Sequence, residues 1–391
     1  MNILVTGFAY VRKNILDVYR YYPAECGDNI CFLLPKEWKI KGGAFIYKPP
    51  EYPNVFTSPA LCHHSNYPLI GGAFKGLMLG LPIFLFKHRR KKIDLIFSAM
   101  EPFLLSTLYE GIWAKILGIK HLIFSWENLS PETKFKGLNL LAKKIIIKTN
   151  LFFSDGIICG NKKSSKIMSR YTSKPVFQSP LSGVDEDFFT KLDIKKIFRG
   201  NNFENKIIYT FAGSLSYRKG IHHIINAFSE VSKKISNAVL VIAGTGEYEK
   251  DINELIKKSD VSSSIFRFPW ISHDEMRELL SMTDIFVYPS MRYKGWEEQL
   301  GYLVMEASLM ELAIITTNSG SLDEVAIDRK TAILVDPDKS EPLANAMIEL
   351  GNNEDLRIRL GKEARIFMST NFGHRVIAKR LSSFFHSFHN S

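Results

Sequence analysis

Short apolar runs rich in β-branched residues alternate with amphipathic segments along the second half of the chain. The run at 207–213 is typical of a β-strand, and the next segment repeats apolar residues at helical spacing from Ile221 to Ile235. Similar strand-like runs are AVLVIAG, IFRF, IFVYP, LAIITT and AILVD, and the helical stretches between them include DINELIKK, HDEMRELL and EPLANAMIEL. Strands that alternate with helices indicate parallel sheets built from βαβ units.

The first half repeats this alternation less cleanly. Its strand-like runs are NILVTG, NICFLLP, IDLIFSA, HLIFSW and DGIICG, and its helical stretches are PFLLSTLYEGIWAKILG and FKGLNLLAKKIIIK. At 391 residues the chain exceeds the size at which a single core stops growing, about 250 to 300 residues. Because periodicity lapses at 186–206, we expect two doubly wound α/β domains, residues 1–190 and 191–372. A terminal helix at 373–391 is expected to pack back on the first domain.

Composition is that of a globular protein, with 46% hydrophobic and 23% charged residues. The four cysteines form no C-x-x-C pair and no metal-ligand pattern, so we expect a reduced, cytoplasmic protein. The first ten residues lack the charged and apolar segments of a signal peptide and are typical of a first strand. The longest uncharged apolar run, 76–86, is shorter than the roughly 20 residues that span a bilayer, so no transmembrane helix is expected.

The net charge of +11 is confined to the first half of the chain. Residues 1–190 carry 25 Lys and Arg against 14 Asp and Glu, whereas residues 191–391 carry 26 of each. Such asymmetry indicates an anionic partner: nucleic acid, membrane headgroups or a phosphorylated substrate. Basic clusters follow or interrupt apolar segments at 87–92 and 142–148, which favours peripheral association with an anionic membrane surface. A core helix that ends in a solvated basic turn is an equally good interpretation.

A glycine turn and two cations follow the strand at 207–213. Gly213 precedes Arg218 and Lys219, and a helix begins directly afterwards, so backbone N–H groups and the helix dipole would favour a phosphate here. The pattern lacks the G-x-x-x-x-G-K-[ST] sequence of a P-loop. A second tight turn, Gly244 to Gly246, follows the next strand; alone, such a turn only closes a βα loop.

Two glutamates, Glu298 and Glu306, stand eight positions apart across the start of an apolar helix near Gly301. If every step were helical, the spacing would reach its upper bound of about 12 Å, at ~1.5 Å per residue. That is close to the separation of the two hydroxyl-rich ends of a nucleotide sugar. Carboxylates accept hydrogen bonds from diols, and the helix start between them would bind the diphosphate. The alternative is that both acids are solvated, but the apolar neighbours of Glu306 would make its unpartnered burial costly.

The segments PLSGVDEDFF, FAGSLSYRKGIHHIINAF, VIAGTGE and WEEQLGYLVMEA occur in an order that resembles retaining glycosyltransferases of family 4. The resemblance is strongest from about Pro180 to Leu350. It implies the GT-B fold, in which two doubly wound Rossmann-like domains face a cleft. Residues 1–190 would then form the acceptor-binding domain and 191–372 the nucleotide-sugar donor-binding domain.

The resemblance also implies an activity and its site. The enzyme would move a hexose, with retention, from a nucleoside-diphosphate sugar to a glycan or lipid-linked saccharide, and would need no metal or other cofactor. Glu298 would contact the donor sugar and Glu306 the ribose diol, while Lys219 and Arg218 would bind the diphosphate. The other implied donor-binding residues are Gly213, Ser214, Gly244, Gly246, Gln299, Leu300, Gly301, Tyr302 and Leu303.

This chain departs from the family pattern at several positions. Ser214 stands where the family commonly has arginine, and Glu311 and Ala313 replace a glycine and a proline after Glu306. The acceptor half lacks the common histidine. The candidate acceptor-side residues are instead those at two strand ends, Glu101, Trp126, Glu127 and Asn128. A buried capping glutamate and a packing tryptophan are the structural alternative.

Other functions are compatible with parts of this pattern. Two D-x-D sequences, 185–187 and 336–338, could suggest a metal, but both fall in expected turns and no metal ligation is expected. A nucleotide-sugar epimerase would share the fold. A basic nucleic-acid-binding protein is the alternative from another class, but the basic half shows no recognised nucleic-acid module, so no nucleic-acid partner is expected. The expected location is the cytoplasm, with peripheral binding to the cytoplasmic face of a membrane as an extension.

Overall fold

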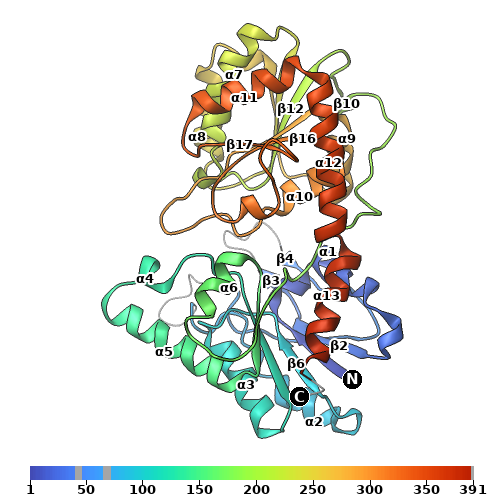
Figure 1. Ribbon diagram of the computed structural model, residues 1–391, viewed down its shortest axis with the longest axis vertical. Helices are drawn as coiled ribbons and strands as arrows, with labels where there is room; N and C mark the ends of the chain where they lie inside the picture. Colours follow the sequence, from blue (N-terminus) through green and yellow to red (C-terminus); the bar gives the residue numbers. More distant parts are fainter. Residues whose placement is uncertain (40–45, 65–71, 389–391) are drawn as a thin grey trace. The chain divides into compact units, whose positions relative to one another are not determined.

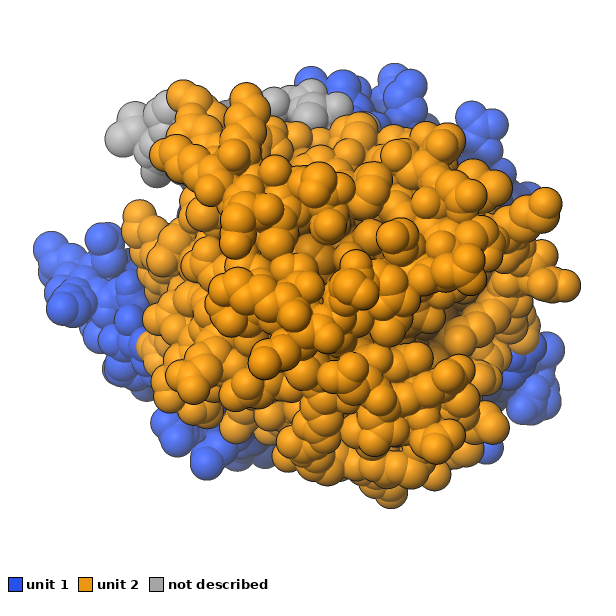
Figure 2. All heavy atoms as spheres, turned by 90° about the horizontal axis from the view of Figure 1, so that it is seen from above, with its two compact units in different colours: residues 1–183, 374–391 blue, residues 184–373 orange. Residues whose placement is uncertain are grey.

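The computed structural model describes residues 1–39, 46–64 and 72–388, and the chain divides into two compact units (Figures 1 and 2). Unit 1 contains Met1–Gly183 and His374–Ser391, and unit 2 contains Val184–Gly373. The segment at 186–206, which the sequence suggested as a domain boundary, therefore belongs to unit 2. There it includes a short hairpin of β10 (Ile197–Phe198) and β11 (Asn201–Asn202).

Unit 1 is built on a seven-stranded parallel sheet in the order β5-β2-β1-β6-β7-β8-β9. The strands are β1 (Asn2–Thr6), β2 (Asn29–Pro35), β5 (Val55–Ser58), β6 (Leu95–Ser98), β7 (Lys120–Ser125), β8 (Gly156–Cys159) and β9 (Val176–Gln178). A short antiparallel pair, β3 (Trp38–Lys39) and β4 (Ile46–Tyr47), follows β2. The helices are α1 (Lys13–Leu16), α2 (Leu81–Lys87), α3 (Leu105–Ile116), α4 (Pro131–Lys134), α5 (Gly137–Phe153), α6 (Lys162–Met168) and α13 (His374–His386).

Both faces of this sheet are covered, which explains why its strands are apolar throughout rather than alternating. Ile3 and Val5 of β1 pack in one core cluster with residues of α13, whereas Leu4 packs in another with residues of α2 and α3. The period of two in a strand sends neighbouring side chains to opposite faces. The terminal helix thus contributes Leu381 and Phe385 to the core of unit 1.

Unit 2 has a six-stranded parallel sheet in the order β14-β13-β12-β15-β16-β17. Its strands are β12 (Ile207–Ala212), β13 (Ala238–Ala243), β14 (Ile265–Phe268), β15 (Ile285–Tyr288), β16 (Ala313–Thr317) and β17 (Ile333–Val335). The helices are α7 (Ile221–Lys234), α8 (Glu249–Lys258), α9 (His273–Met282), α10 (Tyr302–Leu309), α11 (Ser340–Asn352) and α12 (Glu354–Phe372). The predicted fold class, two doubly wound parallel α/β units, is confirmed.

The strand orders locate a topological switch point in each unit. In unit 2 the chain winds outward from β12 through β13 and β14, then crosses back to β15 and winds the other way. In unit 1 the corresponding neighbours are β1 and β6. Loops at the carboxyl ends of such neighbours diverge and leave room for a ligand, so these two places are where sites are expected.

Candidate active site

The loops that follow β12 and β15 bring the predicted donor residues of unit 2 together. The two strands are parallel neighbours, with Tyr209 opposite Ile285 and Thr210 opposite Phe286, so their carboxyl ends lie side by side. The loop after β12 carries Lys219, and the loop after β15 carries Glu298, 79 positions along the chain. The structure therefore brings these two candidate residues together at the switch point of unit 2.

Glycines allow the loops after β12 and β13 to lie directly against each other. Gly213 and Gly244 have φ values of 136° and 134°, in a region that side chains rarely adopt. A Cβ atom on Gly244 would lie 1.9 Å from the carbonyl oxygen of Gly213, and one on Gly246 would lie 2.2 Å from that of Leu215. The glycines noticed in the sequence are therefore required by close backbone packing, whether or not they also contact a ligand.

Lys219 and Glu298 form a buried ion pair. The Glu298 carboxylate accepts hydrogen bonds from the Lys219 ammonium, from the Tyr288 hydroxyl at 3.0 Å and from the Ser290 hydroxyl at 3.2 Å. Burial acts to raise the pKa of Glu298, but the charges of Lys219 and Arg218 and the hydrogen bonds outweigh it, so the pKa lies below its usual value. The carboxylate is therefore held in its charged form. Burial also lowers the pKa of Lys219, and Glu298 offsets part of that effect.

Several buried polar atoms around this pair have no hydrogen-bond partner within the described part of the chain. Arg218 stacks on Trp296, with its guanidinium carbon 3.4 Å from the ring centre, and its Nη1 atom is buried and unpaired. The same holds for the hydroxyl groups of Ser216, Ser319 and Ser321, from the loops after β12 and β16. Buried polar groups are nearly always satisfied in folded proteins. Four such atoms at one carboxyl edge indicate a place where a polar ligand binds.

Glu306 lies in α10 with only 9% of its surface exposed. Its carboxyl group makes no hydrogen bond or ion pair with any residue that the structure describes, and burial raises its pKa to about 8. An unpartnered buried acid costs stability, so its presence indicates a partner supplied from outside. The helix α10 begins only at Tyr302, so Glu298 lies in the loop before it. The upper bound for eight helical steps between the two glutamates therefore does not apply.

The remaining predicted donor residues lie along the same loops. Gly301 adopts a φ of 83° and caps the start of α10, where Tyr302 and Leu303 begin the helix. Leu300 is buried in the core, so only its backbone could contact a ligand, whereas Ser214 is exposed beside Gly213. Gln299 is half-buried. Downstream, Glu311 occupies the family's glycine position with a φ of 54°, so the left-handed turn is kept without glycine.

The acceptor-side candidates in unit 1 also lie at strand ends. Glu101, after β6, accepts hydrogen bonds from the Ser125 hydroxyl and from the backbone N–H of Trp126, both at 2.8 Å. Burial, with a smaller contribution from Glu127, raises the pKa of Glu101 to about 7. Glu127 pairs with Lys134, and both Glu127 and Asn128 are buried. Glu101 thus organises the loop after β7, and its contact with an acceptor stays a prediction.

One small group of side chains in unit 2 could hold a metal ion. Ligand atoms of His222, His223 and Asp338 lie within 4.8 Å of one another, and His223 Nε2 lies 3.0 Å from Asp338 Oδ1. Asp336 pairs instead with Lys339, and Asp185 accepts backbone N–H groups from Asp187 and Phe188. Of the D-x-D carboxylates, Asp338 is the one that belongs to this group of three.

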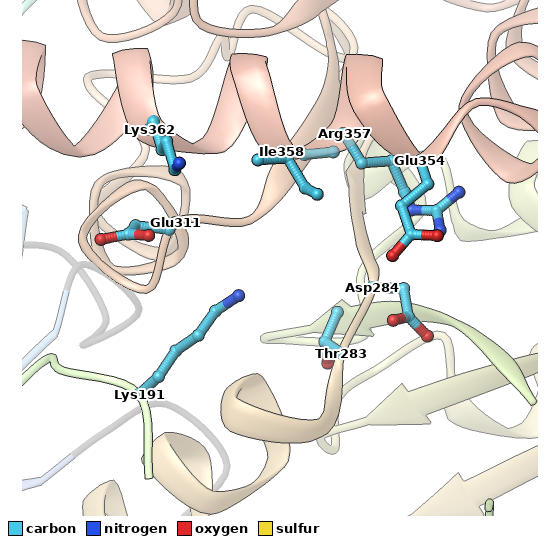
Figure 3. A pocket seen from close by; sticks show the side chains of 9 residues that line it. Lys191, Thr283, Asp284, Glu311, Glu354, Arg357, Ile358 and Lys362 are labelled. Atoms are coloured by element: carbon cyan, nitrogen blue, oxygen red, sulfur yellow. The ribbon is translucent and has the colours of Figure 1, made fainter. Parts of the chain in front are cut away.

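A pocket of about 190 Å³ lies elsewhere in unit 2, at the amino edge of the sheet (Figure 3). Asp284, which lines it, precedes β15 and is paired with Lys196 at 2.9 Å, while Arg357 of α12 donates to the carbonyl oxygens of Leu350 and Gly351. These charges hold the hairpin and the helices in place. Ligands of doubly wound sheets bind at the opposite, carboxyl edge, so this pocket is not the candidate site.

Known proteins resemble this chain in sequence and in fold. Residues 193–367 match the family model described as glycosyl transferases group 1. Residues 193–367, which make up most of unit 2, therefore belong to this group 1 glycosyltransferase family. The matched segment contains every predicted donor-side residue of unit 2, including both members of the buried pair and Glu306.

Among the curated proteins similar to this chain is a GDP-mannose-dependent alpha-(1-6)-phosphatidylinositol monomannoside mannosyltransferase of Mycobacterium tuberculosis. It is 25% identical over 209 residues, which are 52% of this chain and 54% of that protein. The chain thus spans about half the length of this relative.

Solved structures resemble this chain along its whole length. HepE of Anabaena, solved with UDP, matches with a TM-score of 0.75 and 16% identity over 99% of this chain and 100% of that one. Sucrose-phosphate synthase from Thermosynechococcus elongatus matches with a TM-score of 0.77 and 17% identity over 100% of both chains. At such identities the likeness shows the fold alone, and the predicted GT-B fold is confirmed.

Sequence reasoning missed several residues of the candidate site. Tyr288 and Ser290 were seen only as the end of a strand, yet both donate to Glu298. Ser319 and Ser321 lie after β16, a loop that carried no motif. Trp296 was part of the quoted motif but had no role, and it stacks on Arg218. The signal that could have identified them was their position, because these residues end or follow strands at the carboxyl edge of the sheet.

No helix in the described part of the chain is both long and apolar enough to cross a membrane.

Proposed function

We propose that the chain is a retaining hexosyltransferase that moves a sugar from a nucleoside diphosphate to a glycan or lipid-linked saccharide. The observation that carries the proposal is the set of unsatisfied groups at one edge of unit 2. Arg218, the three serine hydroxyls and the unpartnered Glu306 lie around the Lys219–Glu298 pair. To bind a nucleotide sugar, a site needs cations for the diphosphate, hydroxyl groups for hydrogen bonds, and a carboxylate that accepts hydrogen bonds from the ribose diol.

Each residue has a distinct role in the proposed reaction. Glu306 accepts hydrogen bonds from the ribose diol, and Lys219 with Arg218 stabilises the negative charge that develops on the departing diphosphate. Glu298 orients the hydroxyl groups of the donor sugar, and its ion pair with Lys219 fixes both side chains before substrate arrives. The leaving phosphate accepts the proton of the acceptor hydroxyl on the same face, which gives retention of configuration.

The proposed activity is tested by product analysis. The full chain is incubated with UDP-, GDP- and ADP-hexoses, each alone and with glycan or lipid-linked saccharide acceptors. We expect release of the nucleoside diphosphate and an acceptor product one hexose heavier, whose anomeric configuration by NMR matches that of the donor. Conversion of the donor to its epimer without any acceptor would instead establish the epimerase alternative.

A membrane is the second partner that we propose, through an apolar stripe on α5 in unit 1. Leu138, Leu141, Ile145 and Phe152 are 84%, 56%, 55% and 74% exposed, at spacings that place them along one side of the helix. Lysines of the same helix lie beside them, and the first half of the chain carries the entire net positive charge. An anionic lipid surface fits both features, because apolar side chains enter the interface and lysines meet the headgroups.

Liposome flotation tests this partner. We expect more protein to float with anionic than with neutral vesicles, and the variant Lys144→Gln/Lys148→Gln to bind anionic vesicles more weakly. Each lysine near the surface contributes about 1 kcal/mol, roughly fivefold in partitioning. Leu141→Gln/Ile145→Gln should weaken binding to both vesicle types. The matched control is Ile366→Gln, an equally exposed isoleucine of unit 2 at 62%. Equal flotation with both vesicle types would contradict the proposal.

A further inference from the structure

A second group of functional side chains lies at the switch point of unit 1, apart from the predicted acceptor-side residues. Phe8 and Arg12 follow β1, Trp38 lies in β3 and Lys75 precedes α2. We call these four residues the cation–aromatic cluster. The backbone that carries Lys75 is tied to the start of α3, because the Ser106 hydroxyl donates to the Lys75 carbonyl oxygen at 2.7 Å.

Two stacked aromatic rings form the wall of this cluster. The rings of Phe8 and Trp38 are nearly parallel, at 7°, with centres 4.4 Å apart. The Lys75 ammonium lies 4.4 Å from the Phe8 ring centre and 5.9 Å from that of Trp38. Gly76 has a φ of 77°, and a Cβ atom there would lie 2.8 Å from the Phe8 ring, so the lysine segment packs closely against the aromatic wall.

Lys75 has no anionic partner in the part of the chain that the structure describes. Its ammonium lies over the rings of Phe8 and Trp38, and burial is the main cause that lowers its pKa. Arg12 is close enough to lower that pKa further, and its guanidinium lies 5.0 Å from the Tyr47 ring centre. Glu101, which acts in the opposite direction, is already occupied by Ser125 and Trp126.

Lys75 and Arg12 are cations whose charges repel each other, and the nearby carboxyl group of Glu101, which favours the charged Lys75, is held by Ser125 and Trp126. An anion that binds between the two cations would make their arrangement more favourable. The aromatic wall beside them supplies an apolar surface of the kind that lines small-molecule sites. The position, where β1 and β6 diverge, is where a doubly wound sheet binds its ligand.

We infer that the cation–aromatic cluster binds an anionic saccharide, a sugar that carries a phosphate or a carboxylate group. The anion lies between Lys75 and Arg12, and the sugar ring lies against Phe8 and Trp38. This inference rests on the proposed function, for which it names the acceptor class: the accepting saccharide is negatively charged close to its reacting hydroxyl.

The indole N–H signals of the tryptophans test this inference in the full chain by ¹H–¹⁵N NMR. Trp38 reports on the cluster and Trp296 on the donor site, and Trp38→Phe and Trp296→Phe assign the two signals. The probes are glucose 6-phosphate, glucuronate and neutral glucose. We expect at least one anionic sugar to shift the Trp38 signal saturably, and glucose not to do so. A response to glucose 6-phosphate alone would identify the anionic group as a phosphate, and a response to glucuronate alone would identify it as a carboxylate.

Lys75→Met is expected to weaken this binding about tenfold to a hundredfold, the effect of losing one hydrogen bond to a charged group. Lys75→Arg should restore most of it. Arg12→Met, which removes an exposed guanidinium that lies over the Tyr47 ring, should weaken it in the same direction, and the exposed Lys115→Met serves as control. Unchanged affinity in Lys75→Met and Arg12→Met, or no response of Trp38 to either anionic sugar, would overturn the inference.

The two tryptophan signals keep this inference separable from the proposed function. If nucleotide sugars shift the Trp296 signal while anionic sugars leave Trp38 unchanged, the acceptor class is wrong and the donor site stands. If no nucleotide sugar shifts the Trp296 signal, the proposed function itself fails.

Discussion

Replacement of Lys219 with methionine is expected to lower the rate of sugar transfer by about 100-fold to 1000-fold, the usual cost of removing one group that stabilises transition-state charge. Lys219 is the buried cation at the end of the loop after β12, and it pairs with Glu298. Its loss leaves the departing diphosphate with Arg218 alone. The measurement is the steady-state rate of nucleoside diphosphate release in the presence of acceptor.

Stability must be separated from catalysis in this variant. Removing one partner of a buried ion pair leaves an uncompensated charge, which costs about 3 to 5 kcal/mol. The double variant Lys219→Met/Glu298→Gln removes both charges and should regain much of the lost stability, but none of the activity. Lys233→Met, which breaks an exposed pair with Glu230, is the matched control and should transfer sugar normally. Full activity in a folded Lys219→Met protein would contradict the assigned role.

Affinity for the nucleotide sugar is expected to rise with pH between about 6.5 and 8 because of Glu306. In the free protein, burial raises the pKa of Glu306 to about 8, so the group is mostly protonated at pH 7. Hydrogen bonds from the ribose diol favour the carboxylate, so binding releases a proton and higher pH favours binding. The affinity rises by at most about tenfold per pH unit, which is the limit for the release of one proton. It levels off above the pKa that Glu306 has in the free protein.

Titration calorimetry measures this effect, because proton release changes the observed heat between buffers with different ionisation enthalpies. Glu306→Gln keeps hydrogen-bonding capacity without titrating, so its affinity should be independent of pH over this range. Nucleotide sugars are suitable probes because their diphosphate is a diester that does not titrate there. A wild-type affinity that is flat with pH would contradict the assigned contact.

The same pKa has a consequence for stability. The unfolded chain ionises Glu306 near its usual pKa of 4.5, whereas the folded chain does so only near 8. The folded state therefore binds more protons between these values, and the free energy of unfolding contributed by this group falls as the pH rises through them. Nucleotide binding, which favours the carboxylate, should offset that loss.

Much of the fold could be predicted from the sequence. Buried parallel strands are continuous apolar runs, and those at Asn2–Thr6, Ile207–Ala212 and Ala238–Ala243 were found for that reason. Short strands at the margin of the sheet, such as β9, lack such a run. The irregular pattern at 186–206 indicates a loop but cannot say which unit the loop folds on, and the structure places this segment in unit 2.

The candidate site was predictable where a residue type and a strand end coincide. Lys219 and Glu298 were found in this way, and Glu306, which lies within α10, was found through its spacing from Glu298. The pairing of Lys219 with Glu298 was not, because it depends on side-chain directions across two loops that are far apart in sequence. Ser319 and Ser321 were missed because serine is common in every loop, and only the structure shows that their hydroxyl groups are buried and unsatisfied. Lys75 was missed for a similar reason, since a lysine is ordinarily solvated.

The central claim is that unit 2 binds a nucleoside-diphosphate sugar through Glu306, Lys219 and Arg218. Calorimetric titration of the wild-type chain at pH 8 with UDP-, GDP- and ADP-sugars tests it most directly, with folded Glu306→Leu and Lys219→Met variants alongside. The account predicts that at least one donor binds with one-to-one stoichiometry and that both variants lose most of its affinity. Wild-type affinity in both variants, or no binding of any donor to the wild-type chain, would contradict it.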